Sequence, residues 1–510
     1  MTHWIIAPVI LPALLAPIIA YVMRNDVALS RFFSFAGALA LLAIAAGLFA
    51  QAAGGETVVY RLGDWPAPFG IVLVLDRLSA LMLLLTALLA LIVLFHASTT
   101  GWDTRGRHFH ALFQFQLMGI NGAFLTGDAF NLFVFFEVLL IASYGLMIHG
   151  GGKKRLQAGL QYVVMNLAGS TLFLFALGTL YATTGTLNMA DMALRLREIP
   201  VEDAALARVA GLLLMVVFAL KAALVPVHFW LPATYANAPA PVAALFAIMT
   251  KVGAYAILRV HNVAFGPDVP ATGGLVGDWL LPAAVATLAV GAIGVLGATR
   301  LSTLLAFSVI GSMGTLMVAV AAFTPAATAA ALYYLAHSTF AAAALFLIAD
   351  LVLTRRANDR LTLQPPTVQN GLYATLFFGG AIGMAGMPPL SGFLGKLLVL
   401  DGLRDTPLMW LSWSAILVAS LITIVGFARA GSILFWKSTS LETPADPHDT
   451  EPLARPAGLP ELAGPFAALA VLAALTIFAG PAMTYFTETA AQLSDYQGYV
   501  DAVLGEGNQP

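Results

Sequence analysis

Residues 218–232 of this chain read FALKAALVPVHFWLP, and this stretch decides what kind of fold the sequence encodes. It places a lysine, Lys221, inside an apolar run and follows it with two prolines, Pro226 and Pro232. Proline removes a backbone donor and breaks a helix. Within a bilayer, the carbonyl groups freed by such a break are tolerated only where they are buried in protein or line a wet cavity. A basic residue beside a broken helix is the pattern of a transporter ion site.

The rest of the chain has the composition of a multi-pass membrane protein. Of its 510 residues, 60% are hydrophobic and only 10% are charged, and the mean hydropathy is +0.88. Soluble domains carry roughly a quarter of their residues as charged side chains, so this chain has too little charge to cover a water-facing surface. The net charge of −2 argues against nucleic acid as a partner. Because the chain has no cysteine, it offers no disulfide, iron–sulfur or thiolate zinc site, and we expect no cofactor and no metal centre.

The apolar runs predict an all-α fold of about fourteen transmembrane helices, because a spanning helix needs about 20 apolar residues. The predicted ranges are 3–23, 30–52, 71–97, 108–126, 128–149, 157–184, 205–238, 241–262, 277–298, 302–324, 328–353, 372–400, 409–437 and 461–485. The seventh and twelfth of these helices are interrupted. The substantial loops are predicted to be 53–70, 185–204 and 438–460, with a tail at 486–510.

Lysine and arginine predict the orientation, because cytoplasmic loops carry an excess of both. The larger share of the 24 Lys and Arg residues follows odd-numbered helices, as in Lys153, Lys154 and Arg155 after the fifth helix or Arg355 and Arg356 after the eleventh. We therefore expect these loops to face the cytoplasm and both termini to lie outside the cell, in the inner (cytoplasmic) membrane.

Several ionisable residues lie far inside the predicted spans, where a charge costs several kcal/mol and is a functional hypothesis by default. A set of ion pairs that only holds helices together is the structural alternative. The candidates are Glu137, Lys221, Lys251, His337 and Lys396. His337 by itself fits a packing residue and a proton relay equally well.

Glu137 and two of the lysines have the sequence surroundings of a proton site. Glu137 lies about nine residues into its helix among apolar and aromatic neighbours, so it must find a cation or take up a proton. Lys221 is its natural counter-ion. Lys396 follows a second break, because residues 386–396 read GMPPLSGFLGK, with the helix-breaking pair Pro388 and Pro389.

Other charged residues lie near helix ends and are interpreted as structural. Asp76 and Arg77 begin one helix and can reach the membrane interface, and Asp128 begins another, where a carboxylate acts as an N-terminal charge or cap. Arg429 lies within a turn or two of the cytoplasmic end of its helix and can extend to the interface.

The two interrupted helices predict an inverted repeat. Each is the fourth helix in a block of five, with the first block at 108–262 and the second at 277–437. Because five is odd, the two blocks must have opposite topology. The lysine precedes the prolines in the first block and follows them in the second, as expected for an axis in the membrane plane. The remaining segments are a three-helix N-terminal part at 1–107, the last helix at 461–485 and the tail at 486–510.

Four motifs resemble the antiporter-like subunits shared by respiratory complex I and Mrp-type cation/proton antiporters. They are 124–137 (FLTGDAFNLFVFFE), 221–232 (KAALVPVHFWLP), 238–242 (APAPV) and 386–393 (GMPPLSGF). The similarity runs from about residue 70 to 440. Within this superfamily, 125–128 (LTGD) and 137–145 (EVLLIASYG) are most similar to the D subunit of Mrp (Mnh, Pha) antiporters. The complex I relatives usually carry a proline shortly after the glutamate, where this chain has Ala142 and Ser143.

The resemblance implies fourteen helices with two inverted five-helix units. It also implies that Glu137 and Lys221 form the coupled pair of the first half. Lys251 would connect the halves with His337 between, and Lys396 would be the terminal proton site. Other membrane subunits of a hetero-oligomeric complex are the implied partners.

These observations predict a subunit of a monovalent cation/proton antiporter, with Na⁺ as the leading candidate, rather than an enzyme. The alternative is a proton-pumping subunit of a complex I-like NADH-quinone oxidoreductase or a membrane-bound hydrogenase. A scaffold with transport elsewhere and a self-sufficient transporter are two further alternatives. No loop offers a distinctive set of oxygen ligands, so the sequence does not identify the cation.

Overall fold

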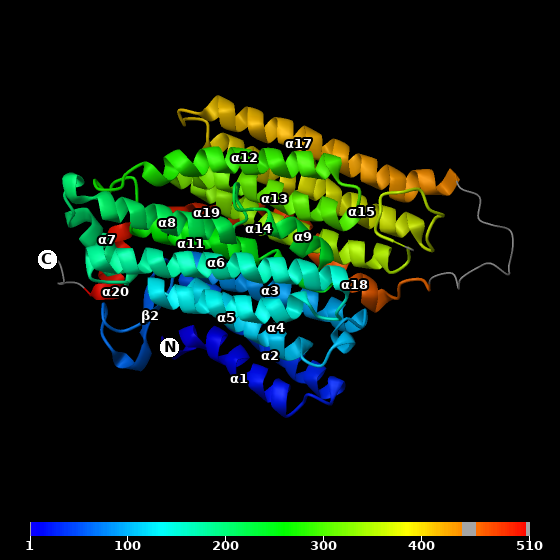
Figure 1. The fold of residues 1–510 in the computed structure, drawn as a ribbon, viewed down its shortest axis with the longest axis horizontal. Helices are drawn as coiled ribbons and strands as arrows, with labels where there is room; N and C mark the ends of the chain where they lie inside the picture. Colours follow the sequence, from blue (N-terminus) through cyan, green and yellow to red (C-terminus); the bar gives the residue numbers. More distant parts are fainter. Residues whose placement is uncertain (1, 357, 441–454, 506–510) are drawn as a thin grey trace.

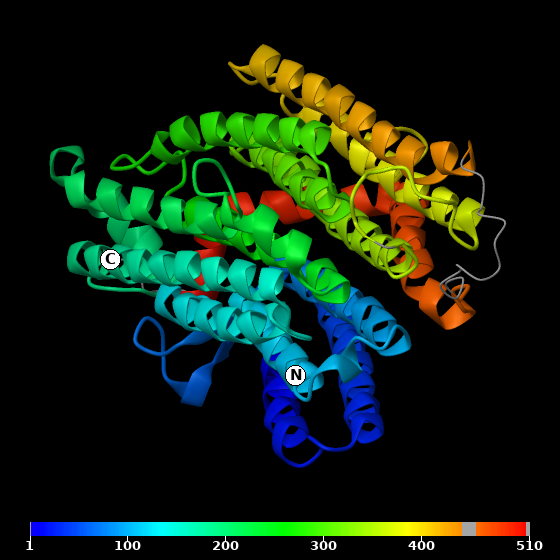
Figure 2. The ribbon, with the colours of Figure 1, turned by 45° about the vertical axis from the view of Figure 1, so that its right-hand side comes forward.

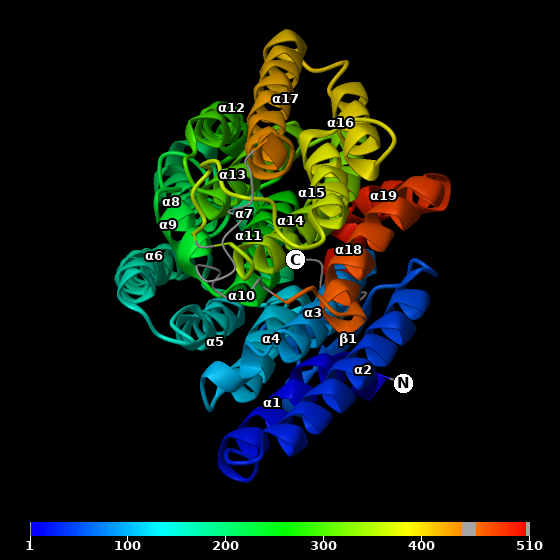
Figure 3. The ribbon, with the colours of Figure 1, turned by 90° about the vertical axis from the view of Figure 1, so that its right-hand side faces the viewer.

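Long helices run side by side along the longest axis of the molecule (Figure 1). The structure is a computed structural model that describes residues 2–356, 358–440 and 455–505. Seen along the helices, α1 and α2 lie at one edge of the bundle and α16 and α17 at the opposite edge (Figures 2 and 3).

The first part of the chain contains the helices α1 (Ala7–Tyr21), α2 (Val27–Ala52), α3 (Arg77–Thr99), α4 (Phe109–Leu125), α5 (Ala129–Met147), α6 (Lys153–Thr184) and α7 (Met189–Glu198). The middle contains α8 (Ala205–Lys221), α9 (Trp230–Asn237), α10 (Ala240–Phe246), α11 (Met249–Ala256), the π-helix η5 (Ile257–His261), α12 (Leu275–Gly297), α13 (Leu301–Val320) and α14 (Pro325–Leu353). The last part contains α15 (Asn370–Ala385), α16 (Ser391–Gly402), α17 (Met409–Gly431), α18 (Leu459–Ile477), α19 (Ala479–Ser494) and α20 (Tyr496–Leu504). Two short strands, β1 (Val58–Arg61) and β2 (Val72–Leu75), pair antiparallel with Val58 opposite Leu75.

The predicted all-α membrane class is confirmed, since ten helical segments of the described chain are long and apolar enough to cross a bilayer. Each of the fourteen predicted ranges contains helix, but the number of crossings stays a prediction.

Three predicted boundaries were wrong. The range 71–97 begins with a strand, because 72–75 are β-branched and leucine residues that pair with β1. The predicted loop 185–204 contains α7, whose first amides donate to the side chain of Asn188. The tail from 486 continues as helix through α19 and α20, and Asp495 caps α20. Residues 441–454 and 506–510, which fall in the predicted loop and tail, lie outside the described residues.

Both predicted helix breaks are present. In the first, α8 ends at Lys221 and α9 begins at Trp230, whose indole Nε1 donates to the carbonyl of Leu220 at 3.0 Å. The amide of Val225 donates to Thr287 Oγ1 of α12 at 2.8 Å. In the second, α15 ends at Ala385 and α16 begins at Ser391. Side chains of the protein therefore satisfy backbone groups that a bilayer could not.

The two most deeply buried spans lie in the middle of the bundle. The span Ala240–His261, formed by α10, α11 and η5, and the span of α14 are buried throughout (Figure 3). By contrast, α17 exposes Leu417, Val418 and Leu421 on its outer face. The outer helices thus present apolar surface to lipid, and the central pair is surrounded by protein.

A glycine allows α8 and α11 to approach each other beside two candidate lysines. A Cβ placed on Gly253 would lie 2.5 Å from the amide nitrogen of Ala222 and 2.9 Å from the carbonyl oxygen of Phe218. Contacts of this kind with backbone atoms cannot be relieved by a side-chain rotation. The close approach therefore requires glycine at this position.

We expect Gly253→Ala to destabilise the protein by about 1–3 kcal/mol, the usual cost of forcing extra atoms into a packed interior. The measurement is the temperature at which the purified complex loses its monodisperse elution in detergent. Gly178→Ala on α6 is the matched control, because nothing lies within 4 Å of the added Cβ. Equal unfolding temperatures for the two variants would contradict this account of the contact.

Candidate functional site

The five candidate residues lie on five different helices of the bundle. Glu137 is on α5, Lys221 ends α8, Lys251 is on α11, His337 is on α14 and Lys396 is on α16. The two central, fully buried spans therefore carry Lys251 and His337.

Glu137 and Lys221 form no direct ion pair in the described residues; two side chains of α6 lie between them instead. The Ser170 hydroxyl donates to Glu137 Oε1, and the ammonium of Lys221 donates to Asn166 Oδ1 at 3.0 Å. Because Asn166 and Ser170 are four residues apart, they lie on the same face of α6. Glu137 still interacts electrostatically with Lys221. The arrangement is a carboxylate and an ammonium coupled through a hydrogen-bonding helix face.

The ammonium of Lys221 has two further sources of stabilisation. It lies 5.9 Å from the centroid of the Phe136 ring, within range of a cation–π interaction. Lys221 is also the last residue of α8, where the helix dipole is negative and favours a cation. The break in the helix thus creates a position that accepts a buried positive charge.

Lys251 has different surroundings. Its side chain is fully buried, and its Nζ has no hydrogen-bond partner among the residues that the structure describes. An isolated buried charge is costly, so this group must meet a water molecule or give up its proton. Lys251 therefore resembles a transfer point more than a structural ion pair.

His337 links the two halves of the line. Its Nδ1 lies 2.9 Å from Ser391 Oγ, at the start of α16, and its side chain is fully buried. It lies close enough to both Lys251 and Lys396 to interact electrostatically with each. Its electrostatic interactions connect it to both lysines, and a position between them stays a prediction.

The side chain of Lys396, on α16, reaches across the second helix break to the end of α15. Its Nζ donates to the carbonyl of Ala385, near the end of α15, and to Ser420 Oγ of α17, both at 2.8 Å. It also lines a cavity of about 20 Å³ together with Ser312, Thr315 and Tyr334. A volume of this size holds about one water molecule.

Sequence reasoning missed the neutral partners of the charged residues. They are Asn166, Ser170, Ser391 and Ser420. The signal for two of them was the spacing of Tyr162, Asn166 and Ser170, a polar row at four-residue intervals along an otherwise apolar helix. Ser391 and Ser420 gave no comparable pattern, because serine is common in membrane helices.

The charged residues interpreted as structural lie at helix ends. Asp128 accepts a hydrogen bond from the amide of Asn131 in α5, which confirms it as a cap. The prediction that Asp76 reaches the interface was wrong: Asp76 caps α3 through Ser79 and is almost fully buried. Arg429 donates to the carbonyl of Ala298 at the end of α12, at 2.6 Å.

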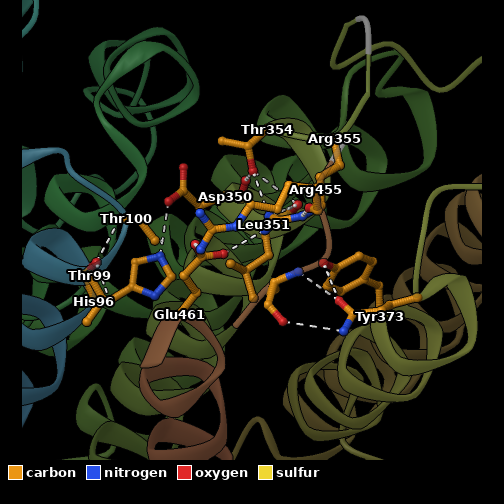
Figure 4. A network of polar contacts seen from close by, with 12 residues as sticks. His96, Thr99, Thr100, Asp350, Leu351, Thr354, Arg355, Tyr373, Arg455 and Glu461 are labelled. Carbon is orange, nitrogen blue, oxygen red and sulfur yellow. Dashed lines mark hydrogen bonds and ion pairs between the residues drawn. The ribbon is translucent and has the colours of Figure 1, made fainter. Parts of the chain in front are cut away.

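A second polar network joins α3, α14 and α18 near the loops rich in Lys and Arg (Figure 4). His96 Nε2 lies 3.0 Å from Asp350 Oδ2, and Arg355 contacts Glu461 at 2.6 Å. No group of three His, Asp or Glu residues in the described part of the chain could hold a metal ion.

The fold and the line of ionisable side chains define a class: a multi-pass membrane protein built around intramembrane charged groups. The model of one protein family, "NADH:quinone oxidoreductase/Mrp antiporter, TM", matches residues 126–425. The chain belongs to this family.

Three proteins show how far the similarity extends. The D subunit of a probable K⁺/H⁺ antiporter of Rhizobium meliloti (strain 1021) is 38% identical, over 97% of this chain and 96% of the relative. The D subunit of the Na⁺/H⁺ antiporter of Bacillus subtilis (strain 168) is 37% identical, over 99% of this chain and 100% of the relative. A chain in the structure of the Mrp complex from Dietzia sp. DQ12-45-1b superposes with a TM-score of 0.90 at 30% identity, covering 99% of this chain and 100% of that chain.

We expect Asn166→Leu to slow proton transfer at least about tenfold, because it removes the hydrogen-bond acceptor of the Lys221 ammonium. Proton movement in membrane vesicles, followed with a pH-sensitive dye, measures the effect. Thr171→Val on the same helix is the control, since the Thr171 hydroxyl bonds only to the carbonyl of Leu167 and faces outward. Unchanged transfer in Asn166→Leu would show that the α6 contact is not part of the site.

Proposed function

We propose that this chain is the D subunit of a multisubunit monovalent cation/proton antiporter in the cell membrane, and that it conducts protons. The observation that carries the proposal is a series of five ionisable residues, each on a different helix: the buried Lys221, Lys251 and His337 and the half-buried Glu137 and Lys396. The names of the two relatives, both of them D subunits of antiporters, support the same conclusion. The partners are other membrane subunits of the complex.

In the first half, the charge states of Glu137 and Lys221 are coupled. A proton on Lys221 stabilises Glu137 as a carboxylate, since opposite charges attract strongly in a low dielectric. When Glu137 is neutralised, the ammonium loses this stabilisation and its proton moves on. Asn166 and Ser170 fix the two groups at a distance that allows coupling without a direct ion pair.

From Lys221 the proton continues to Lys251 and then through His337 to Lys396. Histidine suits the middle position because its imidazole has two distinct ring nitrogens and can act as a proton shuttle. The ranges 108–262 and 277–437 then act as two inverted units, with 1–107, 461–485 and the tail from 486 packed around them.

The two ends of the bundle support an orientation. The loops that follow α5 and α14, with Lys153, Lys154, Arg355 and Arg356, lie at the end opposite the chain termini (Figure 1). Positive loops face the cytoplasm, so both termini would lie outside the cell.

The exchanged cation is proposed only as a monovalent one. One relative is named for K⁺ and the other for Na⁺. The ionisable groups of this chain account for proton transfer and offer no separate cation site among the described residues.

The alternative of a redox-driven pump differs in the partners rather than in this chain. We expect the native complex, extracted in mild detergent, to contain several hydrophobic chains and no flavin or iron. Mass spectrometry of the chains and measurement of flavin and iron test this. The presence of subunits with flavin or iron–sulfur clusters would contradict the antiporter assignment and would indicate that electron transfer drives proton movement along the lysines.

The alternative of a scaffold is tested by Lys221→Ala. We expect this variant to abolish antiport, measured as cation-dependent proton movement in vesicles, while the complex assembles normally. The exposed Lys153→Ala is the control, because Lys153 lies in the first turn of α6 at the surface. Full antiport in Lys221→Ala would refute the proton route, and loss of the complex would favour a structural role.

A further inference from the structure

Lys251 begins a row of polar side chains along its helix. Tyr255 and Arg259 follow it at intervals of four residues, so the three lie on one face. Arg259 Nε donates to the Tyr255 hydroxyl at 3.2 Å, and that hydroxyl donates to the carbonyl of Phe124 at 2.6 Å. Arg259 itself lies in the π-helix η5, a deviation frequently found at functional sites.

The row ends on a buried carboxylate outside the spanning segments. Arg259 forms two hydrogen bonds with Asp76, at 2.5 and 2.8 Å, and both residues are almost fully buried. Burial alone would raise the pKa of Asp76, but the charge and hydrogen bonds of Arg259 outweigh burial and hold the pKa below its usual value. Arg259 thus stabilises the ionised form of Asp76, and the pair marks a polar point about 12 Å along the helix from Lys251.

A cavity of about 200 Å³ lies against this pair. Asp76, Arg259, Gln492, Tyr499 and Ala502 are among the residues that line it. A polar space of this size holds several water molecules. The Tyr499 hydroxyl supports this, because it is buried without a hydrogen-bond partner among the described residues.

The large cavity at the other end of the bundle has no polar continuation along α14. That cavity, of about 540 Å³, reaches Asp350 among Lys153, Arg155 and Arg300. From Asp350, α14 runs back to His337 through residues 340–349, which are all alanine, leucine, isoleucine or phenylalanine. A dry stretch of this kind offers a proton no hydrogen-bonded path.

We propose that the cavity formed by Asp76, just before α3, and by residues of η5, α19 and α20 is the outer mouth through which Lys251 exchanges protons with the solvent. The water in this cavity carries the proton, and the Tyr255 hydroxyl extends the hydrogen-bonded route toward Lys251. Arg259 does not release a proton. It is a positioning residue that orients the Tyr255 hydroxyl and supplies a fixed positive charge at the wall of the cavity. This inference rests on the proposed function and adds a branch to it: the line from Lys221 to Lys396 also meets the outer solvent at Lys251, at the end of the bundle where both termini lie.

The absence of cysteine from this chain makes a direct test possible. Ala502→Cys places a thiol in the wall of the cavity, and Ser494→Cys places one on the adjoining exposed surface. Each variant of the whole complex, in right-side-out vesicles, is treated with a membrane-impermeant, negatively charged thiosulfonate. Proton movement is then compared with that of the same variant before labelling, and the unsubstituted complex shows any effect of the reagent on other subunits.

We expect labelling at Ala502→Cys to slow proton movement at least fivefold and a reducing agent to restore it. Labelling at Ser494→Cys should leave the rate unchanged. Complete labelling at Ala502→Cys without slower proton movement would contradict the proposal that this cavity is the outer mouth. A failure of the reagent to label Ala502→Cys from outside would contradict it as well. If Lys221→Ala abolishes antiport while labelled Ala502→Cys remains fast, the proton route stands and its outer mouth lies elsewhere.

Discussion

The structure depends on one constraint: a lysine ammonium inside a bilayer must be stabilised by the protein, because lipid cannot solvate it. Two of the three lysines in this line meet this constraint at the negative end of a helix. Lys221 is the last residue of α8, and Lys396 donates to a carbonyl at the end of α15. Breaking a spanning helix therefore exposes carbonyl groups and, in the same place, creates the partner that a cation needs.

The third lysine, Lys251, has no such partner among the described residues, and its position in the bundle explains why it differs from Lys221 and Lys396. Lys251 lies on a central span surrounded by other helices, with α8 close beside it at Gly253. Its neighbours in the line, Lys221 and His337, belong to the two halves of the bundle. A group that is weakly stabilised, and placed between better stabilised groups, suits transfer more than storage of a proton.

Neutral side chains control the distances in this line. Asn166 and Ser170 keep Glu137 and Lys221 coupled but apart, and Ser391 and Ser420 hold His337 and Lys396. In a direct buried ion pair, the loss of one charge leaves the other uncompensated and costs about 3–5 kcal/mol. Separating the charges with hydrogen-bonding side chains keeps either group free to change its protonation state.

The sequence by itself determined the membrane class, the two broken helices and the five ionisable residues. These follow from local properties: apolar runs of spanning length, prolines within them, and charges that lipid excludes. The sequence did not predict the strand β2, which forms by pairing with β1. It also did not predict the helix α7, which begins at a cap supplied by Asn188. Only the tertiary structure decided that α6 supplies a hydrogen-bond partner to both Glu137 and Lys221, that His337 interacts electrostatically with two lysines, and that Arg259 meets Asp76. Partners of this kind come from helices far apart in the chain, and only the packing of the bundle fixes which faces meet.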